Sequence, residues 1–251
     1  MISSDPVDVL LADIAHDPED DLPRFVLGDL LADRGDPRGE FLQVEMQLHT
    51  GQLTSAQRQY LEHRRRSLLG RHVLDWLGPF ADAARSWEFQ RGFLHLELPA
   101  ERLSLALLKN PCAAWIEQIR VLDCYFRLSD SLLEGLLRHA SSLQFHEDLN
   151  LASLVGRLFR QTHSSRLRRL HLEGGMFPTP AIHRLIEGET QTRLLELTLS
   201  HQTITAHQVQ LLVAGSWKNL RRLILRRCSI SGEEVSQLRE RFAERLQLLP
   251  E

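Results

Sequence analysis

Three side chains in the middle of the chain, His146, His171 and Glu173, are of types that bind zinc or transfer protons. His171 and Glu173 are close in sequence, whereas His146 could join them only from a neighbouring strand of a sheet, about 4.8 Å away. One hypothesis is therefore a zinc or acid–base site. A surface His–Glu pair without function is the more ordinary interpretation. A hydrolase is a minor alternative, because the sequence implies no enclosed pocket.

A second candidate group is the set of carboxylates Asp29, Asp33 and Glu40, which could supply oxygen ligands to a metal ion. Arginines close in sequence favour ion pairs over metal binding. We therefore interpret the group as a charge network that fixes the angle between two helices. The neighbouring arginines are Arg24, Arg34 and Arg38.

Known catalytic motifs do not occur in the chain. It has no phosphate-binding loop, no G-x-G-x-x-G after a strand, no H-E-x-x-H and no G-x-S-x-G. The cysteines, Cys112, Cys124 and Cys228, lack the spacing of metal ligands. The acidic N-terminus is unlike a secretory signal, and the apolar runs are too short to cross a bilayer. We expect a reduced, cytoplasmic protein that is not an enzyme and uses no cofactor or metal.

A recurring spacing of leucines predicts where the polar side chains lie. The pattern L-x-x-L-x-L occurs clearly three times and faintly three times, with a period of 24 to 27 residues. This motif at this period indicates leucine-rich repeats, in which each unit contributes one short strand and one helix to a solenoid. The residues at or near the fourth position of the pattern are Leu94, Ile119, Leu143, Leu170, Leu197 and Leu223.

Helix signals follow the strands at matching offsets. Thr205 with Gln208, and Ser231 with Glu234, have the spacing of capping boxes. Cys124 and Cys228 occupy a place in the repeat where the chain turns inward, so we interpret both as structural. Apolar residues at helical spacing predict a helix over residues 233–249 that caps the solenoid. Dimerisation through this helix is the alternative.

Several polar positions recur beside the leucines and should face outward from the sheet. Arg169, Glu196 and Arg222 alternate in sign on successive strands and should form a ladder of compensating charges. Four other arginines, Arg168, Arg221, Arg226 and Arg227, are expected to be uncompensated, which would make the C-terminal half of the concave surface basic. The predicted partner-binding residues are Arg168, Arg169, His171, Glu173, Glu196, Thr198, Arg221, Arg222 and Arg226.

The first 85 residues have a different character. Apolar residues at helical spacing predict helices throughout residues 5–80, and Gly35 with Asp36-Pro37 predicts a tight turn between two of them. The segment from Pro23 to Gln43 resembles the bacterial repeat-companion domain, a helical module that precedes leucine-rich repeats. The matching residues are Pro23, Arg24, Leu27, Asp29, Leu31, Asp33, Arg34, Gly35, Asp36, Pro37, Arg38, Gly39, Glu40 and Phe41.

These resemblances imply an α/β fold with two parts. Residues 1–85 are expected to form an all-α capping domain. Residues 86–251 are expected to form a leucine-rich-repeat solenoid with a parallel sheet, similar to the ribonuclease-inhibitor type. This chain has Gly28 and Leu30 where the companion family commonly has Ala and Trp, a difference that affects packing. The companion resemblance carries no established activity.

Charge is divided unevenly along the chain. The net charge is −3, but residues 1–50 contain twelve acidic residues and three arginines, a net of −9, so residues 51–251 carry +6. We expect an interaction scaffold, monomeric or weakly dimeric, whose concave face binds an acidic protein. Neither a nucleic acid nor a membrane is expected as partner, because the sequence pI is near 6.5 and nucleic-acid motifs are absent. The alternative is a regulator of a partner enzyme, either an inhibitor or a GTPase-activating type of factor.

Overall fold

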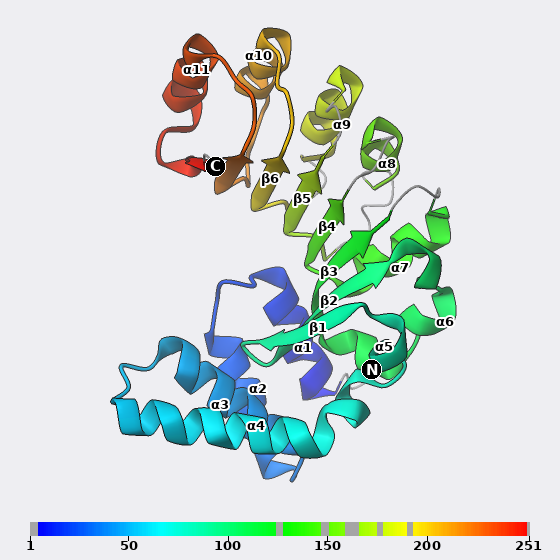
Figure 1. The fold of residues 1–251 in the computed structure, drawn as a ribbon, viewed down its shortest axis with the longest axis vertical. Helices are drawn as coiled ribbons and strands as arrows, with labels where there is room; N and C mark the ends of the chain where they lie inside the picture. Colours follow the sequence, from blue (N-terminus) through cyan, green and yellow to red (C-terminus); the bar gives the residue numbers. More distant parts are fainter. Residues whose placement is uncertain are drawn as a thin grey trace.

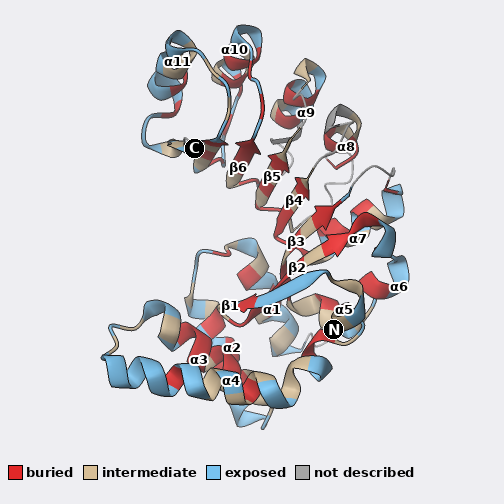
Figure 2. Cartoon of the chain, viewed as in Figure 1, coloured by how far each residue is buried: buried red, intermediate tan, exposed pale blue. Residues whose placement is uncertain are grey.

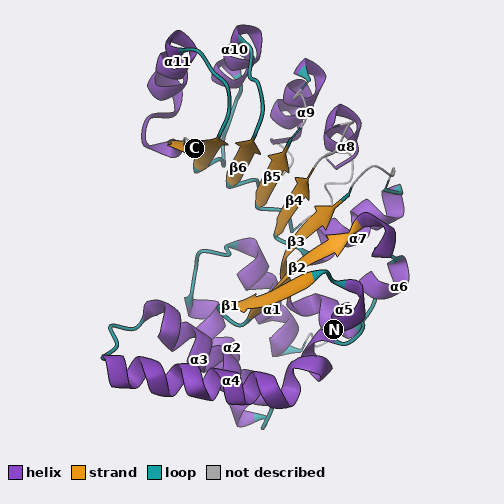
Figure 3. Ribbon diagram, in the orientation of Figure 1, coloured by secondary structure: helices purple, strands orange, loops and turns teal. Residues whose placement is uncertain are grey.

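The structure is a computed structural model that describes residues 5–123, 128–146, 151–158, 166–174, 178–189 and 193–249. Within these ranges the chain has an α/β fold built on one eight-stranded, mostly parallel sheet (Figure 3). The α/β class and the parallel pairing agree with the prediction, which expected six strands. No helix in the described ranges is long and apolar enough to span a membrane.

The order of strands in the sheet is their order in the chain. All neighbouring strands are parallel except β1 and β2, which form an antiparallel hairpin. The strands are β1 (Ser86–Gln90), β2 (Phe93–Pro99), β3 (Ile116–Leu122), β4 (Ser142–His146), β5 (Arg169–Glu173), β6 (Glu196–Ser200), β7 (Arg222–Arg226) and β8 (Leu246–Leu249).

The leucine pattern correctly predicts β2 to β7, and it sets which side chains face inward. Leu170, Leu197 and Leu223 pair in register and are buried, whereas Glu196 beside them is partly exposed. One register differs from the prediction, because Leu96, not Leu94, pairs with Ile119. The same strand pair contains a β-bulge, in which β3 has one extra residue opposite Leu94 and His95.

Helices cover one face of the sheet and leave the other face open. Figure 1 shows the strands along the inside of an arc, with α7 to α11 along its outside. Both predicted capping boxes form, at Thr205 and at Ser231. The helices in this part are α6 (Leu105–Leu108), α7 (Asp130–His139), α8 (Leu151–Leu158), α9 (Thr179–Glu189), α10 (Ala206–Ala214) and α11 (Gly232–Phe242).

The predicted helix over residues 233–249 is wrong in its second half. Helix α11 ends at Phe242, a short 3-10 turn follows, and residues 246–249 form β8. The reason is that β7 would otherwise present an unpaired backbone edge, which β8 covers by parallel pairing. Leu238 and Phe242 of α11 are almost fully buried in the same core, so this apolar face is used within the chain.

Helices fill the N-terminal part, as predicted: α1 (Pro6–His16), α2 (Leu22–Asp33), α3 (Pro37–Thr50), α4 (Ser55–Leu77) and α5 (Phe80–Ala83). The predicted turn also forms, with Gly35 at φ +73° and the Asp36 side chain capping α3. Only some of the apolar residues of α2 are buried. Leu22 and Val26 are exposed, and the buried face is formed by Arg24, Leu27, Gly28 and Leu31.

The N-terminal helices join the sheet through aromatic side chains. Phe41 of α3 lies 4.8 Å from Trp76 of α4 and 5.2 Å from Phe89 of β1, measured between ring centroids. This cluster belongs to the same buried core as the strand leucines, a core that runs from Phe41 to Phe242 (Figure 2). Arg38 lies over the ring of Trp115, 4.6 Å from its centroid.

Candidate binding site on the open face of the sheet

The open face is lined by rows of side chains that run across the strands. Because side chains alternate along a strand, the leucines point into the core and the residues between them point outward. Each row is set by the parallel register. The middle row is Arg120, Gln144, His171, Thr198 and Ile224, and the row nearest the strand ends is His146, Glu173, Ser200 and Arg226.

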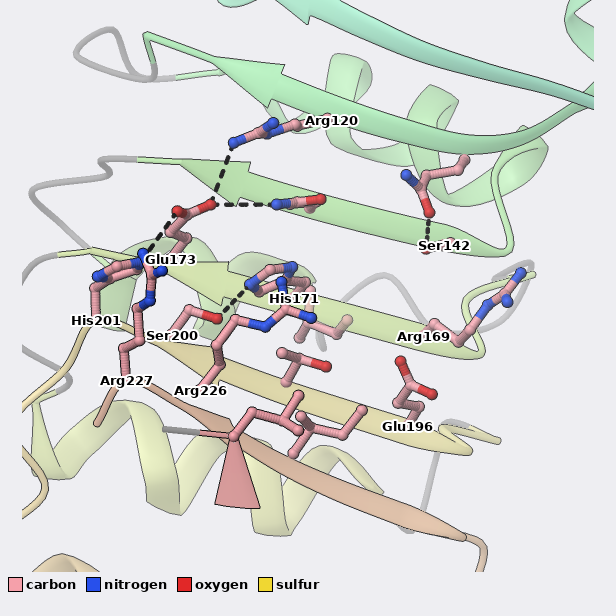
Figure 4. A pocket seen from close by; sticks show the side chains of 16 residues that line it. Arg120, Ser142, Arg169, His171, Glu173, Glu196, Ser200, His201, Arg226 and Arg227 are labelled. Carbon is pink, nitrogen blue, oxygen red and sulfur yellow. Dashed lines mark hydrogen bonds and ion pairs between the residues drawn. The ribbon is translucent and has the colours of Figure 1, made fainter. Parts of the chain in front are cut away.

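These rows line an open pocket of about 770 Å³ that extends from β3 to β8. Its lining is mainly polar, and its described residues include no Phe, Tyr or Trp. Six strands at about 4.8 Å spacing make it roughly 24 Å long. The formally charged side chains in the lining are Arg120, Arg169, Arg226, Arg227, Glu173 and Glu196, as Figure 4 shows.

Glu173 lies at the centre of the polar contacts in this pocket. Its carboxylate accepts hydrogen bonds from Arg120 at 3.3 Å and from Gln144 at 3.2 Å. The Nε2 atoms of His146 and His201 lie 3.7 and 3.8 Å from its other oxygen. The predicted approach of His146 to Glu173 is therefore confirmed, and the carboxylate is held by side chains from β3, β4 and the end of β6.

His171, predicted to join that pair, instead contacts Ser200, with 2.7 Å between Nε2 and Oγ. Burial lowers the pKa of His171 to about 4, and the nearby Glu173 carboxylate opposes this shift only partly. The ring is therefore neutral near pH 7 and holds Ser200 in place. Ser200 itself is 1% exposed, which shields its hydroxyl from a substrate.

The proposed metal ligands do not assemble. Among the described residues, no group of three or more His, Cys, Asp or Glu side chains is placed to hold a metal ion. Glu40 forms an ion pair with Arg64, and Asp29 accepts a hydrogen bond from Gln43 at 2.8 Å. These carboxylates therefore link neighbouring helices, α3 to α4 and α2 to α3.

The residues that follow β3, β5, β6 and β7 have a left-handed backbone conformation: Asp123 (φ 54°), Gly174 (81°), His201 (55°) and Arg227 (51°). The backbone N–H of His201 donates to the Arg226 carbonyl, and that of Arg227 donates to the Leu249 carbonyl. A side chain here costs roughly 1–2 kcal/mol relative to glycine. The turn nevertheless carries His201 and Arg227, which both line the pocket.

Arg226 and Arg227 differ from the other arginines of the pocket. Arg120 is bound to Glu97 and Glu173, and Arg169 to the buried Glu117. Arg226 and Arg227 are exposed and form no ion pair with any residue that the structure describes. In Figure 4 their side chains point toward the cluster formed by His171, His201 and Glu173. They are therefore the cations of this face that remain available to a ligand.

The other arginines expected to be uncompensated are occupied within the chain. Arg168 is buried and donates to the His16 carbonyl at 2.8 Å. Arg221 lies 3.4 Å from Asp17, a residue of the α1–α2 loop (residues 17–21). In the predicted charge ladder, Arg222 does contact Glu196 at 3.1 Å, and it also contacts Glu19 of the loop at 3.1 Å. The loop thus neutralises the edge of the sheet where the strands begin.

A buried charge cluster joins the α1–α2 loop, α2 and the sheet. Glu117, the extra residue of the bulge in β3, lies 2.8 Å from the buried guanidinium of Arg24. Arg91 and Arg169 approach its other oxygen. Burial by itself would raise the pKa of Glu117, but the surrounding Arg24, Arg169, His95 and Arg91 hold it below the ordinary value. The Pro18 carbonyl accepts hydrogen bonds from Arg24 and Arg91.

Six of the nine predicted binding residues line the pocket: Arg169, His171, Glu173, Glu196, Thr198 and Arg226. Arg168, Arg221 and Arg222 do not, because they face the N-terminal segment. The list of predicted binding residues omitted Arg120, His201 and Arg227, although Arg227 was expected to add to the basic charge of the concave surface. The sequence does contain a signal for His201 and Arg227. Both occupy the same position of the repeat as Gly174, and glycine is the residue that favours the left-handed turn found there.

The contacts of Cys228 agree with its interpretation as a structural residue. The Cys228 thiol donates to the Leu199 carbonyl at 3.3 Å, and burial raises its pKa, so it is a poor thiolate. Cys124 lies outside the described residues.

Neither a scan against protein-family models nor a search of curated proteins gave a match to this chain.

Proposed function

We propose that this protein is a leucine-rich-repeat solenoid, capped by an N-terminal module of the repeat-companion type, that binds a partner protein on its open face. The repeat assignment is supported by the parallel register of β2 to β7 at the leucine period, with a helix after most strands on the covered face. The module assignment is supported by the turn at Gly35 and the cap at Asp36.

The observation that carries the proposal is the pocket itself. It is open, about 770 Å³, and lined by side chains, most of them polar, from six neighbouring strands. Such a surface is preformed by the sheet, so a partner can bind with little ordering of the protein. Its length suits an extended polypeptide segment of about seven residues at 3.3–3.6 Å each.

Hydrolysis fits the same site less well. Ser200 and His171 have the spacing of a nucleophile and its base, but the serine is buried. A histidine with a pKa of about 4 is also a weak base at neutral pH. The arrangement therefore favours binding over catalysis. Whether binding also regulates a partner enzyme is decided by measuring that enzyme's rate with and without this protein.

The test compares three purified proteins as baits for affinity capture. One is the wild type, one carries R226E and R227E on the open face, and the control carries R184E and R239E on the helical face. Arg184 and Arg239 are exposed on α9 and α11, so the control has the same charge change. We expect the wild type and the control to capture the same protein, and the open-face variant to lose it. Equal capture by all three would place the binding site elsewhere.

A further inference from the structure

The open face is unevenly neutralised, and the excess positive charge lies at its C-terminal end. The pocket lining contains four arginines and two glutamates, a formal excess of two positive charges when its histidines are neutral. Arg120 and Arg169 already contact carboxylates, and Glu196 contacts Arg222. The excess therefore resides on Arg226 and Arg227.

We propose that Arg226 and Arg227 bind the side-chain carboxylates of an acidic peptide segment laid across β5 to β8. This inference rests on the proposed function and names the chemistry of the partner. A guanidinium binds a carboxylate through parallel N–H···O hydrogen bonds, and two arginines side by side can hold successive acidic side chains of an extended chain.

The protein's own sequence supplies a precedent for this recognition. At the opposite edge of the same strands, Arg221 and Arg222 contact Asp17 and Glu19 of the α1–α2 loop. An acidic segment therefore already lies across neighbouring arginines of this sheet. Near Arg226 and Arg227, the described residues provide no such segment, so an acidic partner could complete the pattern there.

The backbone after β7 explains why two consecutive arginines serve one pocket. In a regular strand, neighbouring side chains point to opposite faces. The left-handed conformation of Arg227, with φ 51°, breaks this alternation, and both Arg226 and Arg227 line the pocket. Glycine adopts this conformation without strain and does so at the equivalent Gly174. An arginine at residue 227 is thus present despite its cost to folding.

The rest of the lining favours carboxylates of a peptide over a nucleic acid. Glu173 and Glu196 would repel a continuous phosphate backbone, and the described lining contains no Phe, Tyr or Trp ring to serve as a stacking platform for bases. Single carboxylates on alternate residues of a peptide can avoid those glutamates.

The experiment measures fluorescence anisotropy with a labelled peptide of four Glu-Ala repeats, and with a matched Gln-Ala peptide as the uncharged probe. The proteins are the wild type, R226Q/R227Q and the helical-face control R184Q/R239Q. We expect the wild type and the control to bind the Glu-Ala peptide alike, and the open-face variant to bind it at least about tenfold more weakly. The difference should shrink as salt is raised.

Three outcomes would overturn the proposal: equal binding of the two peptides, equal binding by the three proteins, or stronger binding of a short oligothymidylate that depends on the same arginines. If the partner is captured through the open face but the acidic peptide is not bound, the carboxylate chemistry is wrong and the proposed function stands.

A single variant, R227G, separates binding from folding. Glycine relieves the left-handed strain, so its thermal midpoint should equal or exceed that of the wild type while peptide binding weakens. A lower midpoint together with lost binding would make Arg227 a structural residue and would overturn its assignment as a ligand.

Discussion

Glu117 shows how one residue can tie two parts of the molecule together. It is buried with Arg24, which contacts one of its carboxylate oxygens, and Arg91 and Arg169 contact the other oxygen. Removing a charge from water is costly, and here several partners compensate. The carboxylate reaches the arginine cluster from the bulge in β3, where one extra residue interrupts the regular alternation.

We expect Glu117→Gln to destabilise the protein by about 3–5 kcal/mol, because it leaves buried guanidinium groups without their counter-charge. The matched control is Glu187→Gln. Its pair with Arg184 is more than 60% exposed on both sides, so the change should cost less than about 1 kcal/mol. Urea unfolding of both variants measures the difference. Similar losses would show that the cluster is not a net source of stability.

His171 should make stability depend on pH. Its pKa falls from an ordinary 6.5 to about 4 in the folded protein, chiefly through burial. Between these pH values the unfolded chain binds a proton that the folded chain does not. Stability should therefore fall as the pH is lowered from about 6.5 to about 4. His171→Gln keeps a polar group beside Ser200 and should reduce this slope in urea unfolding, whereas an unchanged slope would assign it to other groups.

At the scale of elements, the crossing of α2 and α3 depends on close backbone approach. A Cβ atom on Gly39 would lie 2.2 Å from the Ala32 nitrogen and 2.7 Å from the Gly28 oxygen. Both neighbours are backbone atoms that cannot rotate away. Gly39 therefore lets the helices pack at short range, whereas a Cβ atom on Gly28 would meet only the flexible Gln43 side chain at 3.3 Å and the Gly39 oxygen at 3.6 Å.

Gly39→Ala should consequently destabilise by about 1–3 kcal/mol or more, through overpacking. Gly70→Ala is the control, because Gly70 is also helical but has nothing within 4 Å of the place that an alanine methyl group would take. That change should instead stabilise by about 0.5–1 kcal/mol, since alanine favours helix. Thermal or urea unfolding gives both values. Opposite signs support the close crossing, and equal gains would refute it.

For the whole molecule, the connection between the N-terminal helices and the sheet has a buried part and an exposed part. The α1–α2 loop contacts Arg221 and Arg222 through exposed ion pairs, each worth at most about 1 kcal/mol. The aromatic cluster of Phe41, Trp76 and Phe89 is buried and continuous with the strand core. The buried aromatic cluster should therefore make the N-terminal helices and the sheet unfold together.

We expect α3 and β2 to lose protection from hydrogen exchange at the same urea concentration. Phe89→Ala should shift both together by about 3–5 kcal/mol, because it empties a site between them. Trp87→Ala on the same strand is the control and should cost less, since Trp87 is 40% exposed. Loss of protection in α3 before β2 would mean that the helices unfold independently.

The sequence determined the features that depend on local pattern. The leucine period fixes strands β2 to β7 and their inward side chains, because a side-chain period of two leaves one face apolar. Capping boxes at Thr205 and Ser231, and the turn at Gly35, are set by residues close in sequence. Those contacts form in the predicted places because their geometry needs only a few neighbouring residues.

Tertiary structure decided which charges are free and which strand covers the sheet edge. Arg24, Arg168 and Arg221 find partners far away in sequence, so no local pattern could separate them from Arg226 and Arg227. The extra residue at Glu117 and the strand β8 depend on pairing with a neighbouring strand. A strand edge or a buried charge pairs with the groups that the folded chain places next to it. Those neighbours are far away in sequence, so they are known only once the sheet has assembled.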